Sequence, residues 1–252
     1  MITVKNLQKS FDGKQVLKDI SMSFRPGECN MLIGASGSGK TVLLNMLIGL
    51  TEPDSGEIWY GDEEFTRMSE TEKKALHQKI GVLFQGSALF DFRTVLGNIM
   101  FPMDFLTDWS PAEKKERARY LLDKVNVKDS EDKYPDELSG GMQKRVGIAR
   151  AIALDPEYLF CDEPNSGLDP ETSIVIDQLI SSLTKELGIT TIMNTHDMNS
   201  ILEIGDNIGF LHKGTILWEG DRHSILSSDC RQLTDFLCSN TLARNIIRPQ
   251  GR

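Results

Sequence analysis

The chain has 252 residues, of which 39% are hydrophobic and 26% charged, which is typical of one large α/β domain. Its net charge of −9 argues against a nucleic-acid-binding protein, because such proteins neutralise phosphates with excess Lys and Arg. The N-terminus lacks the apolar segment of a signal peptide, and no apolar run approaches the ~20 residues of a membrane helix. We therefore expect a chain that does not span a membrane and that serves one only through a partner.

The N-terminal part of the sequence predicts strands of two kinds. Residues 2–11 and 15–24 alternate apolar and polar side chains, which is typical of strands in a half-exposed antiparallel sheet. Residues 29–34, CNMLIG, form a continuous apolar run that favours a buried parallel strand. The elements predicted next are a helix at 40–50, a hairpin-like strand at 52–65 and a short buried strand at 79–85.

Residues 94–137 differ in character, because charged side chains and helical spacing dominate there. In SPAEKKERARYLLDKV, Ser110 is placed to cap a helix and Pro111 to occupy its first position. This predicts a small helical subdomain at about residues 88–150. Strands are expected again at 157–163 and 190–195, helices at 170–188 and 197–205, and a final hairpin at 207–220 that turns at Lys213-Gly214.

The four cysteines do not form a metal-binding or redox motif. Cys29, Cys161, Cys230 and Cys238 show no C-x-x-C spacing. Cys29 and Cys161 fall in apolar runs that read as buried strands. We expect four free thiols in a reducing compartment.

The segment GASGSGKT fits G-x-x-x-x-G-K-[ST], the pattern of a phosphate-binding loop. An apolar strand precedes it and a helix follows, which is the context that the chemistry requires. We expect backbone N–H groups of the loop to surround an oxyanion, Lys40 to reach the β- and γ-phosphates, and Thr41 to ligate Mg²⁺. The alternative is a glycine-rich turn that binds nothing. The nucleotide-binding residues predicted here are Gly34, Ala35, Ser36, Gly37, Ser38, Gly39, Lys40 and Thr41.

Two acidic residues end the apolar run YLFCDEP. Asp162 is placed to reach Mg²⁺ through water. A carboxylate at Glu163, beside the γ-phosphate, suits the general base that polarises the attacking water. The alternative is an acidic pair that caps a helix before Pro164.

A second phosphate site is predicted at DELSGGMQKR, about a hundred residues after the first. Ser139 can cap a helix there, and Gly140 and Gly141 follow it. A helix start with free N–H groups favours anions.

Six segments occur in one order: GASGSGKT, FQGSALF, LSGGM, YLFCDEP, SGLD and NTHD. Together they resemble the nucleotide-binding subunit of an ATP-binding-cassette (ABC) transporter over about residues 1–225, with Met142 in place of the usual Gln of LSGGQ. The resemblance implies an α/β fold, a P-loop NTPase of the ABC type. Its parts are a mixed, mainly parallel core sheet, an antiparallel β subdomain and the helical subdomain. Residues 226–252 then form a C-terminal helical tail.

The resemblance also implies roles for residues outside the phosphate-binding loop. Phe11 resembles the aromatic residue that stacks on adenine, and Val16 touches the same base; a core aromatic on a strand is the alternative for Phe11. Gln85 resembles the glutamine that meets Mg²⁺ or the attacking water, with a solvated loop glutamine as the alternative. His196 resembles the histidine that contacts the γ-phosphate and orients Glu163. The implied cofactors are ATP and Mg²⁺, and the implied Mg²⁺ ligands are Thr41, Asp162 and Gln85.

In this family two chains pair head to tail, so the resemblance implies a homodimer. Ser139, Gly140 and Gly141 then bind the γ-phosphate held by Lys40 of the partner subunit, and Asp169 lies in a loop that crosses between subunits. ATP closes the dimer, hydrolysis opens it, and the cycle drives a membrane permease.

The run FQGSALFDFRTVLGNIMFPM and the motif LSGGM are similar to ATPases of the Mla/Mce type, which move phospholipids between bacterial membranes or into chloroplasts. This similarity implies phospholipid transport that maintains membrane lipid asymmetry, at the cytoplasmic face of the inner membrane. The implied partners are permease subunits, an Mce-domain lipid-binding protein and a small regulatory subunit, without nucleic acid. We expect the apolar cluster Leu89, Phe90 and Phe92 to receive a cytoplasmic helix of the permease, unless part of it is core.

The tail contains an amphipathic stretch, CRQLTDFLCSN, with Leu233, Phe236 and Leu237 on one face. It either grips a neighbouring ATPase or folds on its own domain. The basic segment 244–252 after it is expected to be mobile.

Three other functions are alternatives to phospholipid transport. An ABC ATPase for another cargo, such as amino acids, lipoproteins or a drug, would have the same ATP site, because the permease reads the cargo. A soluble ABC ATPase acting on DNA or ribosomes is disfavoured by the single cassette and the acidic composition. A degenerate regulatory cassette is opposed by the intact Lys40, Asp162, Glu163 and His196.

Overall fold

The computed structural model describes residues 1–238, so the predicted basic segment 244–252 lies outside the described residues. The strands are β1 (Ile2–Phe11), β2 (Lys14–Phe24), β3 (Cys29–Ile33), β4 (Ser55–Tyr60), β5 (Glu63–Glu64), β6 (Ile80–Leu83), β7 (Tyr158–Asp162), β8 (Thr190–Thr195), β9 (Asn207–His212) and β10 (Thr215–Gly220). The α-helices are α1 (Lys40–Leu47), α2 (Glu70–His77), α3 (Val95–Leu106), α4 (Pro111–Lys124), α5 (Gly140–Ala151), α6 (Pro170–Leu187), α7 (Met198–Ile204) and α8 (Arg231–Leu237).

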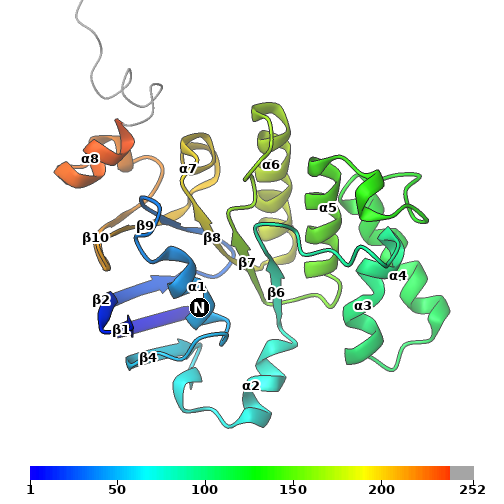
Figure 1. Ribbon diagram of the computed structural model, residues 1–252, viewed down its shortest axis with the longest axis horizontal. Coiled ribbons are helices and arrows are strands. Elements are labelled where there is room, and N and C mark those ends of the chain that lie inside the picture. The colour runs from blue at the N-terminus through cyan, green and yellow to red at the C-terminus, as the bar shows by residue number, and fades with distance from the viewer. Residues whose placement is uncertain (239–252) are drawn as a thin grey trace, which may run out of the picture.

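The strands follow the order β5-β4-β1-β2-β10-β9-β3-β8-β7-β6. One part is antiparallel, with β1 between β2 and β4, and it meets the rest through a single parallel pair, Thr215 with Asp19. Ile2 and Val4 are buried while Thr3 and Lys5 are more exposed, as the alternating sequence predicts. Leu7 is also buried but out of phase, because the register shifts between Val4 and Leu7. The antiparallel strands and helices α3 and α4 lie at opposite ends of the molecule (Figure 1).

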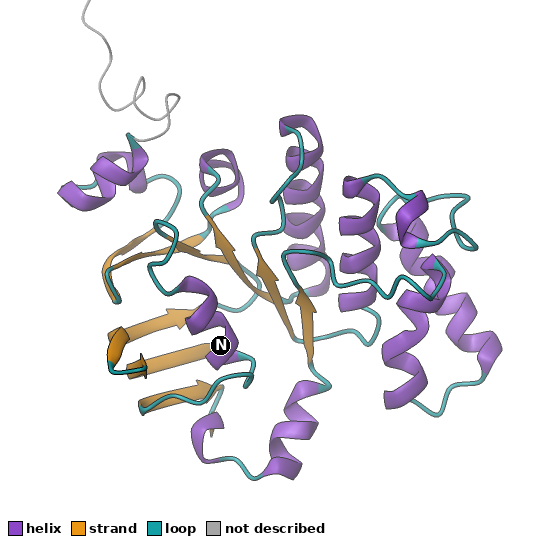
Figure 2. Cartoon of the chain, in the orientation of Figure 1, coloured by secondary structure: helices purple, strands orange, loops and turns teal. Residues whose placement is uncertain are grey.

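The strands β9, β3, β8, β7 and β6 are parallel neighbours and form the core of the sheet. Helices cover the sheet (Figure 2), which explains why β3 is buried along its whole length, with only Asn30 interrupting its apolar side chains. Side chains alternate between its faces: Met31 and Ile33 join one hydrophobic cluster and Leu32 the other. The strand β6 lies at the sheet edge, where Ile80 and Val82 are only half-buried, so the expected burial of this strand is only partly correct.

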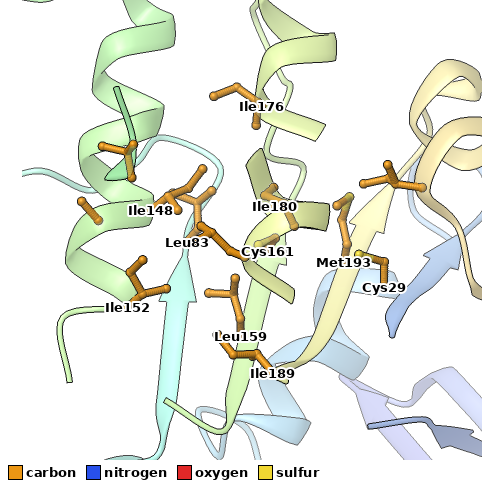
Figure 3. Close-up of a cluster of buried hydrophobic side chains, with 14 of the residues drawn as sticks. Cys29, Leu83, Ile148, Ile152, Leu159, Cys161, Ile176, Ile180, Ile189 and Met193 are labelled. Carbon is orange, nitrogen blue, oxygen red and sulfur yellow. The ribbon is translucent and has the colours of Figure 1, made fainter. Parts of the chain in front are cut away.

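The larger cluster fills the space between the sheet and helices α5 and α6. Figure 3 shows Ile148 and Ile152 of α5 and Ile176 and Ile180 of α6 pointing toward strand residues such as Leu159. Cys29 and Cys161 belong to this cluster and are free thiols, as is Cys230. Burial raises the pKa of the Cys29 thiol to about 11.

Local capping explains where several helices begin. Ser110 accepts the N–H of Glu113, whose carboxylate accepts the N–H of Ser110, and Pro111 is the first residue of α4, as predicted. The helix α2 was not predicted, although Ser69 and Glu72 form the same capping box before it.

The helix α8 packs on its own chain. Leu233 and Leu237 are buried in the larger cluster, and the Phe236 ring centroid lies 5.4 Å from that of Phe210. Of the two alternatives for the amphipathic stretch, the structure therefore shows the fold onto its own domain. Within residues 1–238, no helix is both long and apolar enough to cross a membrane.

Candidate nucleotide-binding site

The predicted catalytic residues meet because parallel strands end at the same edge of the sheet. The strand β8 pairs with β3 on one side and with β7 on the other, with Leu32 and Asp162 both opposite Asn194. The glycine-rich loop therefore leaves β3 beside the residues that follow β7 and β8. Ligands of open parallel sheets bind at this carboxyl edge.

The glycine-rich loop has backbone conformations that only glycine adopts without strain. Gly34 has φ 151° and Gly39 has φ 109°. A Cβ on Gly34 would collide with the backbone oxygen of Leu211, and one on Gly39 would lie 2.7 Å from Leu17 Cδ2. Both glycines are thus required for the close packing of the loop against β2 and β9.

Lys40 is buried beneath the loop, and its Nζ donates to the carbonyl oxygens of Gly34, at 2.8 Å, and Ala35, at 3.3 Å. Desolvation lowers the pKa of Lys40, and the nearby carboxylates of Glu163 and Asp162 act in the opposite direction. In the loop, Ser38 Oγ is buried and has no hydrogen-bond partner within the described residues. A phosphate group fits here, because it would satisfy this hydroxyl and draw the ammonium from backbone carbonyls to anionic oxygens.

Oxygen ligands suited to Mg²⁺ gather beside Lys40. The Thr41 hydroxyl donates to Asp162 Oδ1 at 3.3 Å, and Asn194 Nδ2 donates to the same oxygen at 3.0 Å. A hydroxyl and a carboxylate are hard donors of the kind that Mg²⁺ prefers. Asn194, which orients the carboxylate from the neighbouring strand, was not predicted from the sequence. Gln85 also lines the cleft, and its Nε2 donates to Ser166 Oγ at 3.2 Å.

Glu163 is held between two nitrogen groups. Its Oε2 lies 2.7 Å from His196 Nδ1, and its Oε1 lies 4.0 Å from Lys40 Nζ. The residue has φ 48°, a left-handed conformation that is unusual for a non-glycine residue, and its N–H donates to the carbonyl oxygen of Asn194. Backbone strain of this kind is typical of functional sites. Lys40, Glu163 and His196 are therefore brought together as the sequence predicts.

These groups face a cleft of about 1030 Å³. Its lining residues are Val16, Ala35, Ser36, Gly37, Gly39, Lys40, Thr41, Val42, Gln85, Glu163, His196, Met198, Phe210, His212, Gln232, Asp235 and Phe236. Phe11 does not line it; its ring is 44% exposed, with Lys9 Nζ 5.4 Å from the ring centroid. Phe11 is thus not the core aromatic of the alternative reading. The residues from α8 were not anticipated from sequence.

The second predicted phosphate site does not reach this cleft. In the part of the chain that the structure describes, none of Ser139, Gly140 and Gly141 lines it, and α6, β6 and β7 lie between α5 and α1 (Figure 1). Ser139 Oγ accepts the N–H of Met142 and caps α5. The predicted second half-site is therefore separate from the cleft within one chain.

The residues around the second half-site have structural partners. Asp169 caps α6, accepting the N–H and the hydroxyl of Thr172 at 2.9 and 2.6 Å. These hydrogen bonds lower the pKa of the Asp169 carboxyl. Met142 packs against the larger hydrophobic cluster, and Gln143 Nε2 donates to Pro135 O at 2.8 Å. Gln143 is therefore engaged elsewhere and does not take the place of the glutamine of LSGGQ that Met142 replaces.

The loop that follows Gln85 is held from α5. Lys144, which is buried, donates to the carbonyl oxygen of Gln85. Arg150 donates to the carbonyl oxygens of Ser87, at 2.6 Å, and Ala88, at 2.7 Å. The helix α5, which Ser139 caps, thus donates hydrogen bonds to the backbone of the Gln85 loop. Sequence patterns did not reveal this relationship.

The expected apolar cluster after Gln85 is divided by the fold. Leu89 packs against the core, Phe90 is half-buried, and Phe92 is 76% exposed. Phe90 also lines an apolar groove of about 370 Å³ together with Phe84 and Phe101.

Comparison with known proteins places this site in a family. Residues 17–166 match the family model described as ABC transporter. The methionine import ATP-binding protein MetN of Carboxydothermus hydrogenoformans is 43% identical over 223 residues, which cover 87% of this chain and 66% of that protein. The MetN of Clostridioides difficile is 36% identical over 251 residues, which cover 100% of this chain and 77% of that protein. The chain thus spans slightly less than two thirds of the first of these relatives.

Solved structures agree with the predicted fold. A dimeric post-hydrolysis state of the ATP-binding cassette MJ0796 bound to ADP and Pi has a TM-score of 0.80 and 31% identity, covering 88% of this chain and 99% of that one. The structure of cbiO1 from Clostridium perfringens, described as part of the ABC transporter complex cbiONQ, has a TM-score of 0.84 and 27% identity, covering 97% and 98%. The predicted ABC-type P-loop fold is confirmed, whereas these relatives do not support the Mla/Mce-type assignment. The chain belongs to the ABC transporter family.

Proposed function

We propose that this cassette hydrolyses ATP as a head-to-tail homodimer and drives a membrane permease that carries a solute of the amino-acid class. The single observation that carries the catalytic part is the arrangement of Lys40, Glu163 and His196 at one edge of the sheet. The cargo part rests on the relatives named as methionine import proteins.

Each residue of the cleft has a defined task in this proposal. The glycine-rich loop and Lys40 bind the phosphates, and Thr41 and Asp162, with Gln85, hold Mg²⁺, which neutralises phosphate charge when bound. Glu163 accepts a proton from the attacking water at a carboxylate oxygen. His196 orients that carboxylate through the 2.7 Å contact to its Oε2.

The second half-site supports the dimer. Ser139, Gly140 and Gly141 start a helix away from their own cleft, and a capped helix start attracts an anion. We assign Ser139, Gly140 and Gly141 to binding the γ-phosphate that the partner subunit holds. We assign Asp169 to the boundary between the two subunits. The dimeric MJ0796 cassette is consistent with such pairing.

The groove beside Gln85 supports attachment to the permease. It is lined by apolar side chains such as Phe84 and Phe101 and opens next to the loop held by Lys144 and Arg150. An amphipathic cytoplasmic helix of a permease fits such a groove. Docking there would place the cassette at the membrane surface and connect permease motion with Gln85.

Phospholipid transport is the second candidate cargo. One observation favours it: the run from Phe84 to Met103, which is similar to ATPases of the Mla/Mce type, supplies much of the apolar groove. An Mce-domain protein and a small regulatory subunit would then be additional partners.

Reconstitution distinguishes the two cargoes. The cassette is co-expressed with a candidate permease, and the complex is placed in proteoliposomes. ATP-dependent movement of labelled methionine, absent with Glu163→Gln, is the expected result. Transfer of a fluorescent phospholipid without amino-acid movement would overturn the amino-acid cargo and leave the ATPase assignment intact.

A further inference from the structure

Three buried polar residues form a hydrogen-bonded cluster behind the catalytic edge of the sheet. Asn165 Nδ2 donates to Asp177 Oδ1 at 2.8 Å and approaches Ser200 Oγ at 3.0 Å. The Ser200 hydroxyl donates to Asp177 Oδ2 at 2.7 Å. Asp177 is 1% exposed and Ser200 is fully buried. Both oxygens of one carboxylate therefore accept hydrogen bonds inside the protein.

The cluster joins the two segments that carry the catalytic side chains. Asn165 follows Glu163 by two positions in the turn after β7. Ser200 lies in the first turn of α7, and its N–H donates to Oδ1 of Asp197, the residue after His196. Asp177 lies in the middle of α6 and makes no part of the nucleotide cleft. Its carboxylate thus ties the Glu163 segment and the His196 segment to one helix.

We propose that Asp177 is a positioning residue that sets the contact between Glu163 and His196 through Asn165 and Ser200. The inference rests on the catalytic roles proposed above for Glu163 and His196. An error of about 1 Å in the placement of a catalytic group can cost roughly 100-fold in rate. A shared acceptor between the two segments supplies the rigidity that such placement needs.

The negative charge of Asp177 lowers the free energy of unfolding, which argues against a role in stability alone. Burial raises the pKa of Asp177 to about 6, against the hydrogen bonds from Ser200 and Asn165 that lower it. Asp197 and Glu203, on the α7 side, raise it further, and the thiols of Cys29 and Cys161 face it from β3 and β7.

The sign of the linkage follows from this shift. The folded-state pKa of Asp177 exceeds its ordinary value of 3.8, so the folded state holds the proton more tightly than the unfolded state. Stability from this group therefore falls as the pH rises from 3.8 to about 6. Above that pH the ionised carboxylate destabilises the fold, yet this is the form that the hydrogen bonds from Ser200 and Asn165 favour. Groups retained at such a cost are typical of functional sites.

Protonation of Asp177 would allow a different hydrogen bond within the cluster. Asn165 Oδ1 is buried and has no hydrogen-bond partner among residues 1–238. A protonated Asp177 can donate to this oxygen once the Asn165 amide turns over. The hydrogen bond from Asn165 Nδ2 to Asp177 is then replaced by one from Asp177 to Asn165 Oδ1. We expect the Glu163 segment to shift when this happens.

The test compares Asp177→Asn and Ser200→Ala with the exposed control Asp123→Asn in steady-state ATP hydrolysis. For both cluster variants we expect kcat to fall about tenfold or more, with the KM for ATP unchanged, because Asn165, Asp177 and Ser200 do not line the nucleotide cleft. The Tm of Asp177→Asn near neutral pH should stay equal to wild type or rise. The double variant should lose little more than either single variant.

The pH profile supplies a second readout. Wild-type kcat should fall as the pH drops through about 6, and Asp177→Asn should lack this limb. An unchanged kcat in Asp177→Asn, or a loss that only parallels a lower Tm, would overturn the positioning role. Glu163→Gln separates the two levels of inference: if it is inactive while Asp177→Asn is fully active, the base stands and the positioning role fails. If Glu163→Gln retains turnover, the proposed function fails as well.

Discussion

His196 Nδ1 lies 2.7 Å from Glu163 Oε2, although the two residues follow different strands. The contact exists because β7 and β8 are parallel neighbours that end at the same edge. Glu163 is 17% exposed, whereas the His196 side chain is 67% exposed. The Glu163 carboxylate is therefore sheltered and the His196 imidazole accessible. This arrangement suits a general base that is oriented by a residue able to contact the bound phosphate.

Replacing Glu163 with Gln should remove hydrolysis and leave ATP binding in place. The amide keeps the shape of the side chain but cannot accept the proton from water, so we expect a loss of about 10²–10⁴-fold in kcat. Nucleotide affinity from fluorescence titration should be unchanged, and ATP should trap a closed dimer visible by gel filtration. Glu171→Gln, at an exposed position on α6, is the control. Retained turnover in Glu163→Gln would remove this residue as the base.

Replacing Ser139 with Arg should block hydrolysis without weakening ATP binding to the monomer. Ser139 does not line its own cleft, so a bulky cation there does not reach the nucleotide bound by its own chain. The variant also loses the cap of α5, so its Tm is measured beside its activity. The ATPase rate of the wild type should rise more than linearly with protein concentration, and this dependence should disappear in the variant. Ser182→Arg, exposed on α6, should behave like wild type. A fully active Ser139→Arg would contradict the head-to-tail arrangement.

The parts of the site that sequence could predict are those set by local patterns. The loop around Lys40 follows an apolar strand and opens a helix, and Glu163 and His196 each end a strand, so their meeting follows from parallel topology. Asn194 and Lys144 could not be found in this way. Each acts on a residue distant in the chain, on Asp162 and on Gln85, and no local pattern encodes such a pair.

The packing of α8 is a second feature that the sequence could not predict. Amphipathic spacing places Leu233 and Leu237 on one face of α8 but does not say what covers that face. The structure covers it with the larger core cluster. The missed helix α2 is a different case, because the Ser69 and Glu72 capping box was present in the sequence.

The two glycines that begin α5 should tolerate substitution differently. A Cβ on Gly141 would lie 2.5 Å from Thr172 Cγ2, whereas one on Gly140 would lie 3.4 Å from Leu168 Cδ2. Thr172 holds Asp169 through its hydroxyl, so Gly141→Ala must displace this cap. We expect Gly141→Ala to lower the free energy of unfolding by about 1–3 kcal/mol and Gly140→Ala to change it little. Urea denaturation of the pair measures this, and equal stabilities would show that α5 and α6 adjust freely.

Truncation of Leu233 tests how α8 is held. Leu233 is fully buried in the larger core cluster, so Leu233→Ala removes apolar contacts and leaves a cavity. The expected cost is about 2–5 kcal/mol in the free energy of unfolding, seen as a lower urea midpoint with an unchanged slope. Arg231→Ala, on the same helix but with a side chain 91% exposed, should leave the midpoint near that of wild type.

The measurement is made without ATP and at low protein concentration, so that it reports on the single chain. A Leu233→Ala variant with unchanged monomer stability but weakened ATP-dependent dimerisation would show that α8 grips a second subunit instead of its own domain. The packing of Phe236 against Phe210, whose ring centroids lie 5.4 Å apart, predicts the opposite. Because Phe236 also lines the nucleotide cleft, loosening α8 should additionally raise the KM for ATP, whereas Arg231→Ala should not.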